Sequence, residues 1–358
     1  MNCTADVVFG WFVKELLYAK EEDGVLYLDT WQHRAVAVND ENKLLAKVVS
    51  GDCPCKQFTL EVVSSGVERV AELAQRADHV IVCAGNQPLI NAREEYDRPD
   101  IRLPKAQTAL LNAAAAANES TLLYLVTGYP FAINKEKDTA KAVLCSTHLG
   151  PCLGHVAAAT VFGENNPAGR TPTTWYRSVR DLPALDDYDI AKNHVTYLYF
   201  RGKPLYAFGY GLSYTTFAYS NLTVKQENGE VIATVNVQNT GALDGDEVVQ
   251  LYMSLPGSLR VRPIHALKAF KRVHIKAGET VTVTLNFKID DLAIWCNGRR
   301  STRSKAACTK WKSARRATIF ALPPTWRLQA KRSRVDRASS SRKPSMPMTN
   351  SVFICTKQ

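Results

Sequence analysis

Acidic residues are almost absent from the carboxyl-terminal part of this 358-residue sequence. Residues 297–358 contain 16 Lys and Arg but a single acid, Asp336, whereas residues 1–296 contain 29 basic and 33 acidic residues, a net charge of −4. The formal net charge of +11 therefore belongs to the end of the chain and not to its body. This end shows no periodicity, repeat or nucleic-acid motif. We expect a basic disordered or non-native tail over 297–358, with nucleic-acid binding as an alternative that the pattern does not favour.

Long apolar runs are also absent. A membrane-spanning helix needs about 18 or more consecutive apolar residues, and none occurs, so we expect no membrane partner. The first residues lack a basic segment followed by an apolar stretch and a cleavage site, which predicts no signal peptide and favours a cytoplasmic location. The composition, with 46% hydrophobic and 22% charged residues, is that of a globular chain of two or three domains.

Paired CxxC motifs are absent as well. The nine cysteines are an odd number, and Cys53 and Cys55 form an isolated Cys-Pro-Cys that supplies two of the four ligands a tetrahedral zinc site needs. We expect mostly reduced, unbridged thiols, no metal and no cofactor.

The pattern of apolar residues divides the chain into segments. Residues 1–56 alternate short apolar runs with Asp, Asn and Gly, which predicts short antiparallel strands in a partial β-rich domain. Residues 57–203 alternate helical periodicity with continuous apolar runs, which predicts an α/β sandwich around a parallel sheet buried on both faces. The expected helices are 67–76, 105–118 and 154–162, and the expected strands are 79–85, 121–128 and 141–148.

A second β-rich region follows an interdomain segment at 204–220. Residues 221–296 show period-two strands joined by Asn-Gly and Asn-Thr-Gly turns. This spacing predicts an all-β sandwich of the immunoglobulin or fibronectin type III kind, with five or six of the usual seven or so strands. The domain is therefore expected to be incomplete.

Three sequence segments are the most informative about function. The strand at 79–85 runs into a polar loop, NQPLINAREEYDRPDIRLPKAQ (86–107), at the place where an α/β domain carries its site. Two others, FGENNPAGRTPTTWY (162–176) and PLYAFGYGLSYTTF (204–217), combine turn-forming Pro and Gly with Arg170, which can pair with a carboxylate. We expect their aromatic residues to pack between the sandwich and the α/β domain: Trp175, Tyr206, Phe208, Tyr210 and Tyr214.

Together these phrases resemble the carboxyl-terminal half of glycoside hydrolase family 3, over roughly residues 57–292. The resemblance implies an α/β sandwich followed by a fibronectin type III-like domain, with residues 1–56 belonging to an inserted β domain. It also implies that the substrate is a β-linked oligosaccharide or glycoside, such as a β-xyloside or β-glucoside, hydrolysed with retention.

The run Glu94-Glu95-Tyr96-Asp97-Arg98 resembles the E-x-x-D-R element of the family, whose first Glu acts as general acid/base. The resemblance therefore implies that role for Glu94. Retaining enzymes place a protonated and an ionised carboxyl group about 5 to 5.5 Å apart, and burial or a neighbouring anion keeps the donor protonated. A solvated loop without a catalytic role is the alternative. The further candidates, for substrate binding or for bracing the loop, are Asn86, Asn91, Arg93, Glu95, Asp97, Arg98 and His148.

The nucleophile of the family is an Asp on a (β/α)₈ barrel, which takes about 250 residues. The sequence upstream of residue 57 is too short for one, so we expect the chain to need a separate barrel chain and to be inactive alone. One departure concerns Gly150-Pro151-Cys152, where family members commonly carry Gly-Gln-Glu. A non-catalytic carbohydrate-binding or scaffold role is the other alternative.

Overall fold

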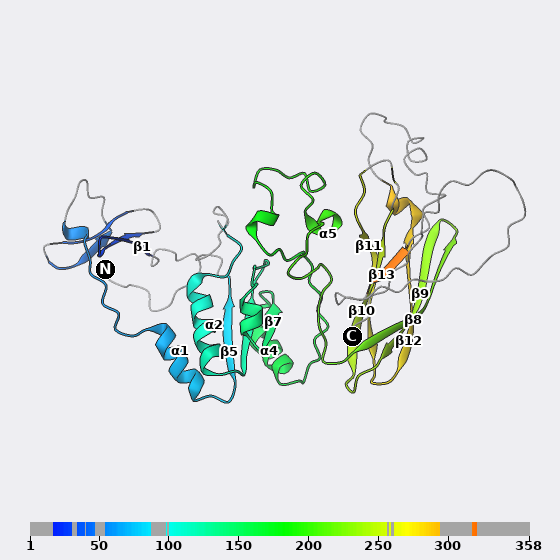
Figure 1. Cartoon of the computed structure of the whole chain (residues 1–358), viewed down its shortest axis with the longest axis horizontal. Helices are drawn as coiled ribbons and strands as arrows, with labels where there is room; N and C mark the ends of the chain where they lie inside the picture. The colour runs from blue at the N-terminus through cyan, green and yellow to red at the C-terminus, as the bar shows by residue number, and fades with distance from the viewer. Residues whose placement is uncertain are drawn as a thin grey trace, which may run out of the picture. The chain divides into compact units, whose positions relative to one another are not determined.

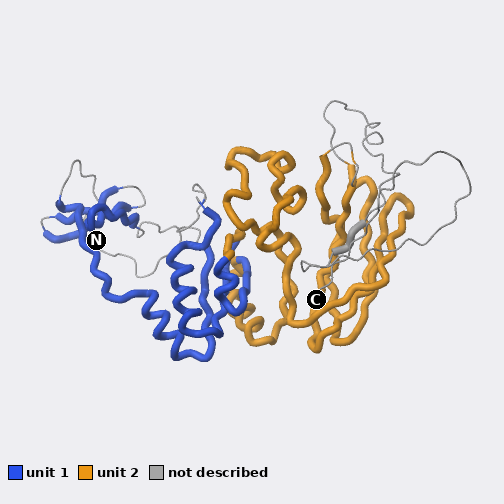
Figure 2. Tube along the Cα trace, viewed as in Figure 1, with its two compact units in different colours: residues 1–128, 135–147 blue, residues 129–134, 148–358 orange. Residues whose placement is uncertain are grey.

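The computed structural model describes residues 17–30, 34–39, 41–46, 54–86, 98, 100–255, 258, 261–293 and the backbone of 317–320. The chain forms two compact units, 1–128 with 135–147 and 129–134 with 148–358 (Figure 2). Among the described residues, no helix combines the length and hydropathy that a membrane span requires.

The amino-terminal part of the first unit is made of short antiparallel strands, as predicted. β1 (Leu17–Glu22) and β2 (Val25–Thr30) form a hairpin through Asp23 and Gly24, both at positive φ, and β3 (Val36–Val38) pairs with β4 (Leu44–Ala46). Cys55, just after these strands, is disulfide-bonded. The expectation of mostly unbridged thiols therefore has an exception at Cys55, because pairing depends on how the fold places two sulfur atoms and not on the cysteine count.

The rest of the first unit is an α/β layer. β5 (Val80–Gly85), β6 (Thr121–Val126) and β7 (Ala142–Ser146) form a parallel sheet in that order. α1 (Gly66–Gln75) begins at Ser65, whose side chain accepts a hydrogen bond from the Glu68 N–H, and it packs on α2 (Lys105–Ala117); the four-residue α3 (Glu136–Thr139) lies before β7. Leu111 and Ala114 of α2 and Leu123 and Leu125 of β6 are fully buried.

β5 departs from the prediction of burial on both faces. Its burial alternates, with Ile81 48% exposed and Cys83 also exposed. Successive side chains of a strand point to opposite faces, and α2 contacts β5, so among the described residues one face of β5 is covered and the face with Ile81 and Cys83 is not.

The second unit combines α4 (Leu153–Val161), the short α5 (Thr196–Tyr199) and a β sandwich (Figure 1). One sheet has the order β12-β9-β8 and the other β11-β10-β13. The strands are β8 (Phe217–Glu227), β9 (Glu230–Asn239), β10 (Gly245–Met253), β11 (Ala266–Ile275), β12 (Thr280–Lys288) and β13 (Ala317–Phe320).

The core of the sandwich is built from inward residues of both sheets. Val235, Val237, Val249, Leu251 and Ile275 are at most 1% exposed and belong to one apolar cluster. Fully burying a side chain of this size contributes about 1.5 to 3 kcal/mol. β13, which pairs antiparallel with β10, comes from the segment for which we expect a tail without native structure.

Candidate active site

The candidate acid/base element follows β5, but its central residues lie outside the described part of the chain. This holds for Glu94 and for Asn91, Arg93, Glu95 and Asp97, so their roles stay predictions. The structure does describe both ends of the segment: Gly85 and Asn86 on one side, and Arg98 with residues 100–104 on the other. Arg98 is half-buried.

Asn86 is hydrogen-bonded at the end of β5 through both its backbone and its side chain. Its backbone N–H donates to the Val126 carbonyl at 3.2 Å, and its side-chain Oδ1 accepts from the Gly128 N–H at 2.9 Å. The side chain therefore ties the end of β5 to the loop after β6. These contacts are compatible with bracing, and both predicted roles of Asn86, bracing the loop and binding substrate, stay predictions.

The returning end of the segment is held by local contacts. The Asp100 carboxylate accepts from the Arg102 N–H at 3.0 Å and from the Arg102 Nε at 2.5 Å. The hydrogen bond from the Arg102 side chain lowers the pKa of Asp100 and keeps this carboxyl ionised. Leu103, 5% exposed, then leads into α2.

Two polar residues near this segment were not among the predicted candidates. Gln107, in the first turn of α2, bonds both backbone groups of Gly85: its Oε1 accepts from the N–H at 3.0 Å and its Nε2 donates to the carbonyl at 3.1 Å. Glu136, 9% exposed, accepts from the Thr108 hydroxyl at 2.8 Å. The signal for Gln107 was the resemblance itself, since the E-x-x-D-R element is usually followed by Leu-Pro and Gln, and Leu103, Pro104 and Gln107 fit that continuation.

His148 follows β7 and is exposed. The next residues, Gly150–Cys152, form a 3₁₀ turn without a side-chain cap, and α4 begins directly after it. Cys152 is a free, exposed thiol. The turn therefore offers backbone groups, but no carboxylate or amide side chain, at the start of α4.

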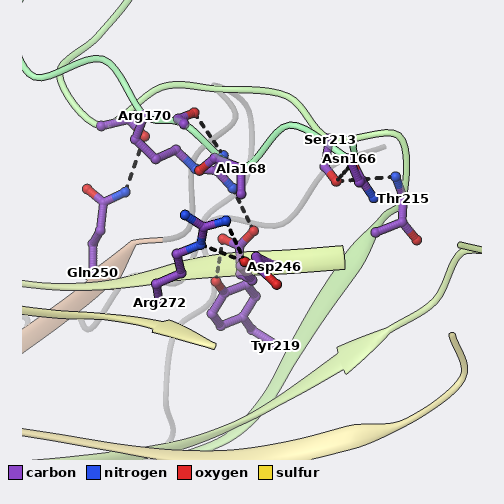
Figure 3. A network of polar contacts seen from close by, with 12 residues as sticks. Asn166, Ala168, Arg170, Ser213, Thr215, Tyr219, Asp246, Gln250 and Arg272 are labelled. Carbon is purple, nitrogen blue, oxygen red and sulfur yellow. Dashed lines mark hydrogen bonds and ion pairs between the residues drawn. The ribbon is translucent and has the colours of Figure 1, made fainter. Parts of the chain in front are cut away.

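The two Gly/Pro phrases form a buried polar network on the sandwich (Figure 3). Arg170 Nη2 bonds Glu247 Oε2 of β10 at 2.7 Å, with both side chains under 10% exposed, which is the carboxylate partner expected for this arginine. Tyr219 of β8 donates its hydroxyl to Glu247 Oε1 at 2.8 Å. Burial raises the pKa of Glu247, and Arg170 and Tyr219 partly offset that rise.

Asn166 joins three segments in the same network. Its Nδ2 donates to the Asp244 carbonyl at 2.9 Å, and its Oδ1 accepts from the Ser213 hydroxyl and the Tyr214 N–H, each at 2.8 Å. In the second phrase, the Gly209 carbonyl accepts a hydrogen bond from Gln250 Nε2 of β10 at 3.2 Å. The phrases are thus fixed to the sandwich by hydrogen bonds to backbone carbonyls as well as by the Arg170–Glu247 pair.

The aromatic rings of the two phrases contact one another and residues of the sandwich, whereas their predicted place between the two domains stays a prediction. Phe208 stacks on Tyr197 with ring centroids 4.0 Å apart and meets Tyr252 of β10 edge-on. Trp175, 6% exposed, contacts Tyr206, which stacks on Tyr210. Tyr214 is 49% exposed, and its hydroxyl donates to the Thr160 carbonyl. Among the residues that the structure describes, no group of three His, Cys, Asp or Glu side chains could hold a metal.

Two regions of the chain match known protein families. Residues 14–214 match the glycosyl hydrolase family 3 C-terminal domain, over more than half of the chain, and residues 247–307 match a fibronectin type III-like domain. The chain belongs to glycosyl hydrolase family 3. The predicted order of an α/β sandwich and a fibronectin type III-like sandwich is confirmed.

The relatives are named as glycosidases and are much longer. A periplasmic beta-glucosidase of Salmonella typhimurium is 35% identical over 243 residues, which are 64% of this chain and 32% of that protein. A xylan 1,4-beta-xylosidase of Xylanibacter ruminicola is 32% identical, over 66% of this chain and 28% of that protein. This chain therefore spans about a third of the length of these relatives.

Solved structures show the same partial overlap. The beta-glucosidase of Kluyveromyces marxianus in complex with glucose superposes with a TM-score of 0.59 at 30% identity, covering 64% of this chain and 29% of that one. For a beta-glucosidase of Bifidobacterium adolescentis the TM-score is 0.61 at 30% identity, with 67% and 38% covered.

Proposed function

We propose that this chain carries the general acid/base of a retaining β-glycosidase, and that Glu94 is the proton donor. The family membership supports this proposal, because the family's E-x-x-D-R element matches Glu94 to Arg98. The position of the element supports it too, since it lies between the carboxyl end of β5 and α2, where open α/β sheets bind ligands. The substrate would be a β-glucoside or β-xyloside, as the names of the relatives suggest.

The complete reaction requires a second carboxylate. A retaining enzyme needs a nucleophile that attacks the anomeric carbon while the acid protonates the leaving oxygen. We propose that an Asp on a separate (β/α)₈ barrel chain supplies this nucleophile. Glu94 would first donate its proton to the leaving group, and would then deprotonate the water that hydrolyses the glycosyl-enzyme intermediate.

The test separates proton donation from binding by varying the leaving group. The chain and its Glu94→Gln variant are each mixed with the barrel part of the Salmonella beta-glucosidase and assayed on phenyl and 2,4-dinitrophenyl β-glucosides. Dinitrophenolate leaves without protonation, so its glycosylation step needs no acid. We expect Glu94→Gln to lower kcat/KM roughly 10²- to 10⁴-fold on the phenyl glucoside and far less on the dinitrophenyl glucoside.

Glu95→Gln is the matched control, because it removes a neighbouring carboxylate of the same type. It should leave the ratio between the two substrates unchanged. Equal losses on both substrates for Glu94→Gln, or a leaving-group effect that appears in Glu95→Gln instead, would contradict the assignment. Lack of turnover in every mixture would contradict the two-chain enzyme and leave a non-catalytic carbohydrate-binding role.

A further inference from the structure

The carboxyl end of β5 has a backbone that accepts glycine alone. Gly85 adopts φ +140°, and a Cβ atom built on it would lie 1.9 Å from the Val126 carbonyl oxygen. A side chain at this position would therefore clash with the backbone of β6 and would also be strained in φ.

A single side chain holds both backbone groups of Gly85. The Gln107 amide oxygen accepts from the Gly85 N–H at 3.0 Å, and the Gln107 amide nitrogen donates to the Gly85 carbonyl at 3.1 Å. An amide is suited to this task because it offers an acceptor and a donor side by side. With both ends engaged by Gly85, Gln107 acts on the backbone and not on a ligand.

Gln107 is itself well anchored. It lies in the first turn of α2, directly after the buried Leu103 and the helix-starting Pro104. The next residue, Thr108, donates its hydroxyl to the buried Glu136 of α3 at 2.8 Å. The first turn of α2 therefore has a contact with α3 through Thr108 in addition to its contact with β5 through Gln107.

The hydrogen bonds of Gly85 also affect the position of Asn86, the next residue. Asn86 donates its backbone N–H to Val126 and accepts from the Gly128 N–H through its side chain. Both bonds depend on the position that the Gly85 backbone gives to Asn86. The Gly128 N–H, which Gln107 does not contact, therefore reports the direction of the chain as it leaves β5.

We propose that Gln107 is a positioning residue, which clamps Gly85 and so fixes the backbone at Gly85 and Asn86, where the segment that contains Glu94 begins. The link to catalysis rests on the proposed function of Glu94, eight residues beyond Asn86 in the sequence.

The test is amide hydrogen exchange in the full chain, followed at single residues by NMR. Gln107→Met keeps the length of the side chain and removes both hydrogen-bonding groups. We expect it to lower the protection of the Gly85 and Gly128 N–H groups by roughly fivefold or more. The Thr127 N–H, bonded to the Ser146 carbonyl in the same part of the sheet, should keep its protection.

Gln107→Glu adds a pH-dependent readout of the same two hydrogen bonds. A protonated carboxyl group has a donor and an acceptor like the amide, whereas a carboxylate can accept from the Gly85 N–H but not donate to its carbonyl. Protection at Gly128 should therefore be near wild type while the introduced carboxyl group is protonated, and should fall as pH rises through the pKa of that group. Because the group faces a carbonyl oxygen, its pKa should lie above the usual value of about 4.3.

The hydrogen-exchange results test the clamp on Gly85 without an activity assay. Gln75→Met on the exposed end of α1 is the matched control and should change none of these amides. Unchanged protection of Gly128 in Gln107→Met, or a pH-independent Gln107→Glu, would overturn the clamp. If Glu94→Gln lacks the leaving-group effect while the amides respond as expected, the proposed function fails and the clamp stands.

Discussion

Among single residues, Arg170 and Glu247 form the most demanding interaction of the described chain. Each is taken almost fully out of water, which costs several kcal/mol per ion before their attraction is counted. Arg170 also donates to the Ala168 and Gly169 carbonyls, and Glu247 accepts from Tyr219, so most of their polar atoms are satisfied. The pair therefore specifies one arrangement of the 162–176 phrase on β10.

Removing one partner of this pair should lower the free energy of unfolding. Glu247→Leu would leave the Arg170 guanidinium buried without a counter-charge, and we expect unfolding free energy in urea to fall by about 3 to 5 kcal/mol. The double variant Arg170→Met/Glu247→Leu should recover part of that loss. A double variant that loses the full sum of the two single losses would contradict this account. Asp187→Asn, in the exposed pair with Lys192, is the control and should have no measurable effect.

At the scale of elements, close backbone approaches decide which glycines are required. A Cβ on Gly211 would lie 2.1 Å from the Gly169 carbonyl oxygen, whereas a Cβ on Gly169 would meet nothing within 4 Å. We expect Gly211→Ala to destabilise the chain by about 1 to 3 kcal/mol, since the two phrases must move apart. Gly169→Ala, measured in the same thermal unfolding experiment, should be close to neutral; equal effects would rule out the contact as the cause.

The extent of what the sequence could predict also differs between elements. β5, β6 and β7 end close to their predicted limits because continuous apolar runs bounded by polar residues are local signals. The exposure of Ile81 and Cys83 was not predictable, since it depends on which layers cover the sheet. The role of Gln107 was hidden for a related reason: its partner Gly85 is 22 residues away, and an amide in a helix usually faces solvent.

The same limit applies to the site. Arg170 was expected to find a carboxylate, but the choice of Glu247, 77 residues further on, comes from the packing of β10 and not from either phrase. For Glu94 the assignment still depends on resemblance to the family motif. Asn86 is the predicted site residue whose contacts the structure supplies, and they hold the backbone.

For the whole molecule, the ties between the phrases and the sandwich predict that the family domain at 14–214 depends on the strands after it. A chain ending at residue 214 would lose Glu247, Gln250 and the Asp244 carbonyl as partners of the phrases. We expect trypsin to cut it between residues 170 and 192 at least tenfold faster than the full chain, because local opening would no longer break buried contacts.

A chain ending at residue 320 keeps every described strand and serves as the control for this experiment. Its cleavage between residues 170 and 192 should match that of the full chain. Equal cleavage of all three chains would show that the sandwich contributes nothing to the order of the phrases.

The contacts of Asn166 and Arg170 with β10 and the loop before it also bear on recombination between relatives. A crossover near residue 214 would pair an arginine from one parent with whatever the other parent carries opposite it. Functional chimeras should therefore inherit both phrases and the first three strands of the sandwich, β8 to β10, from the same parent.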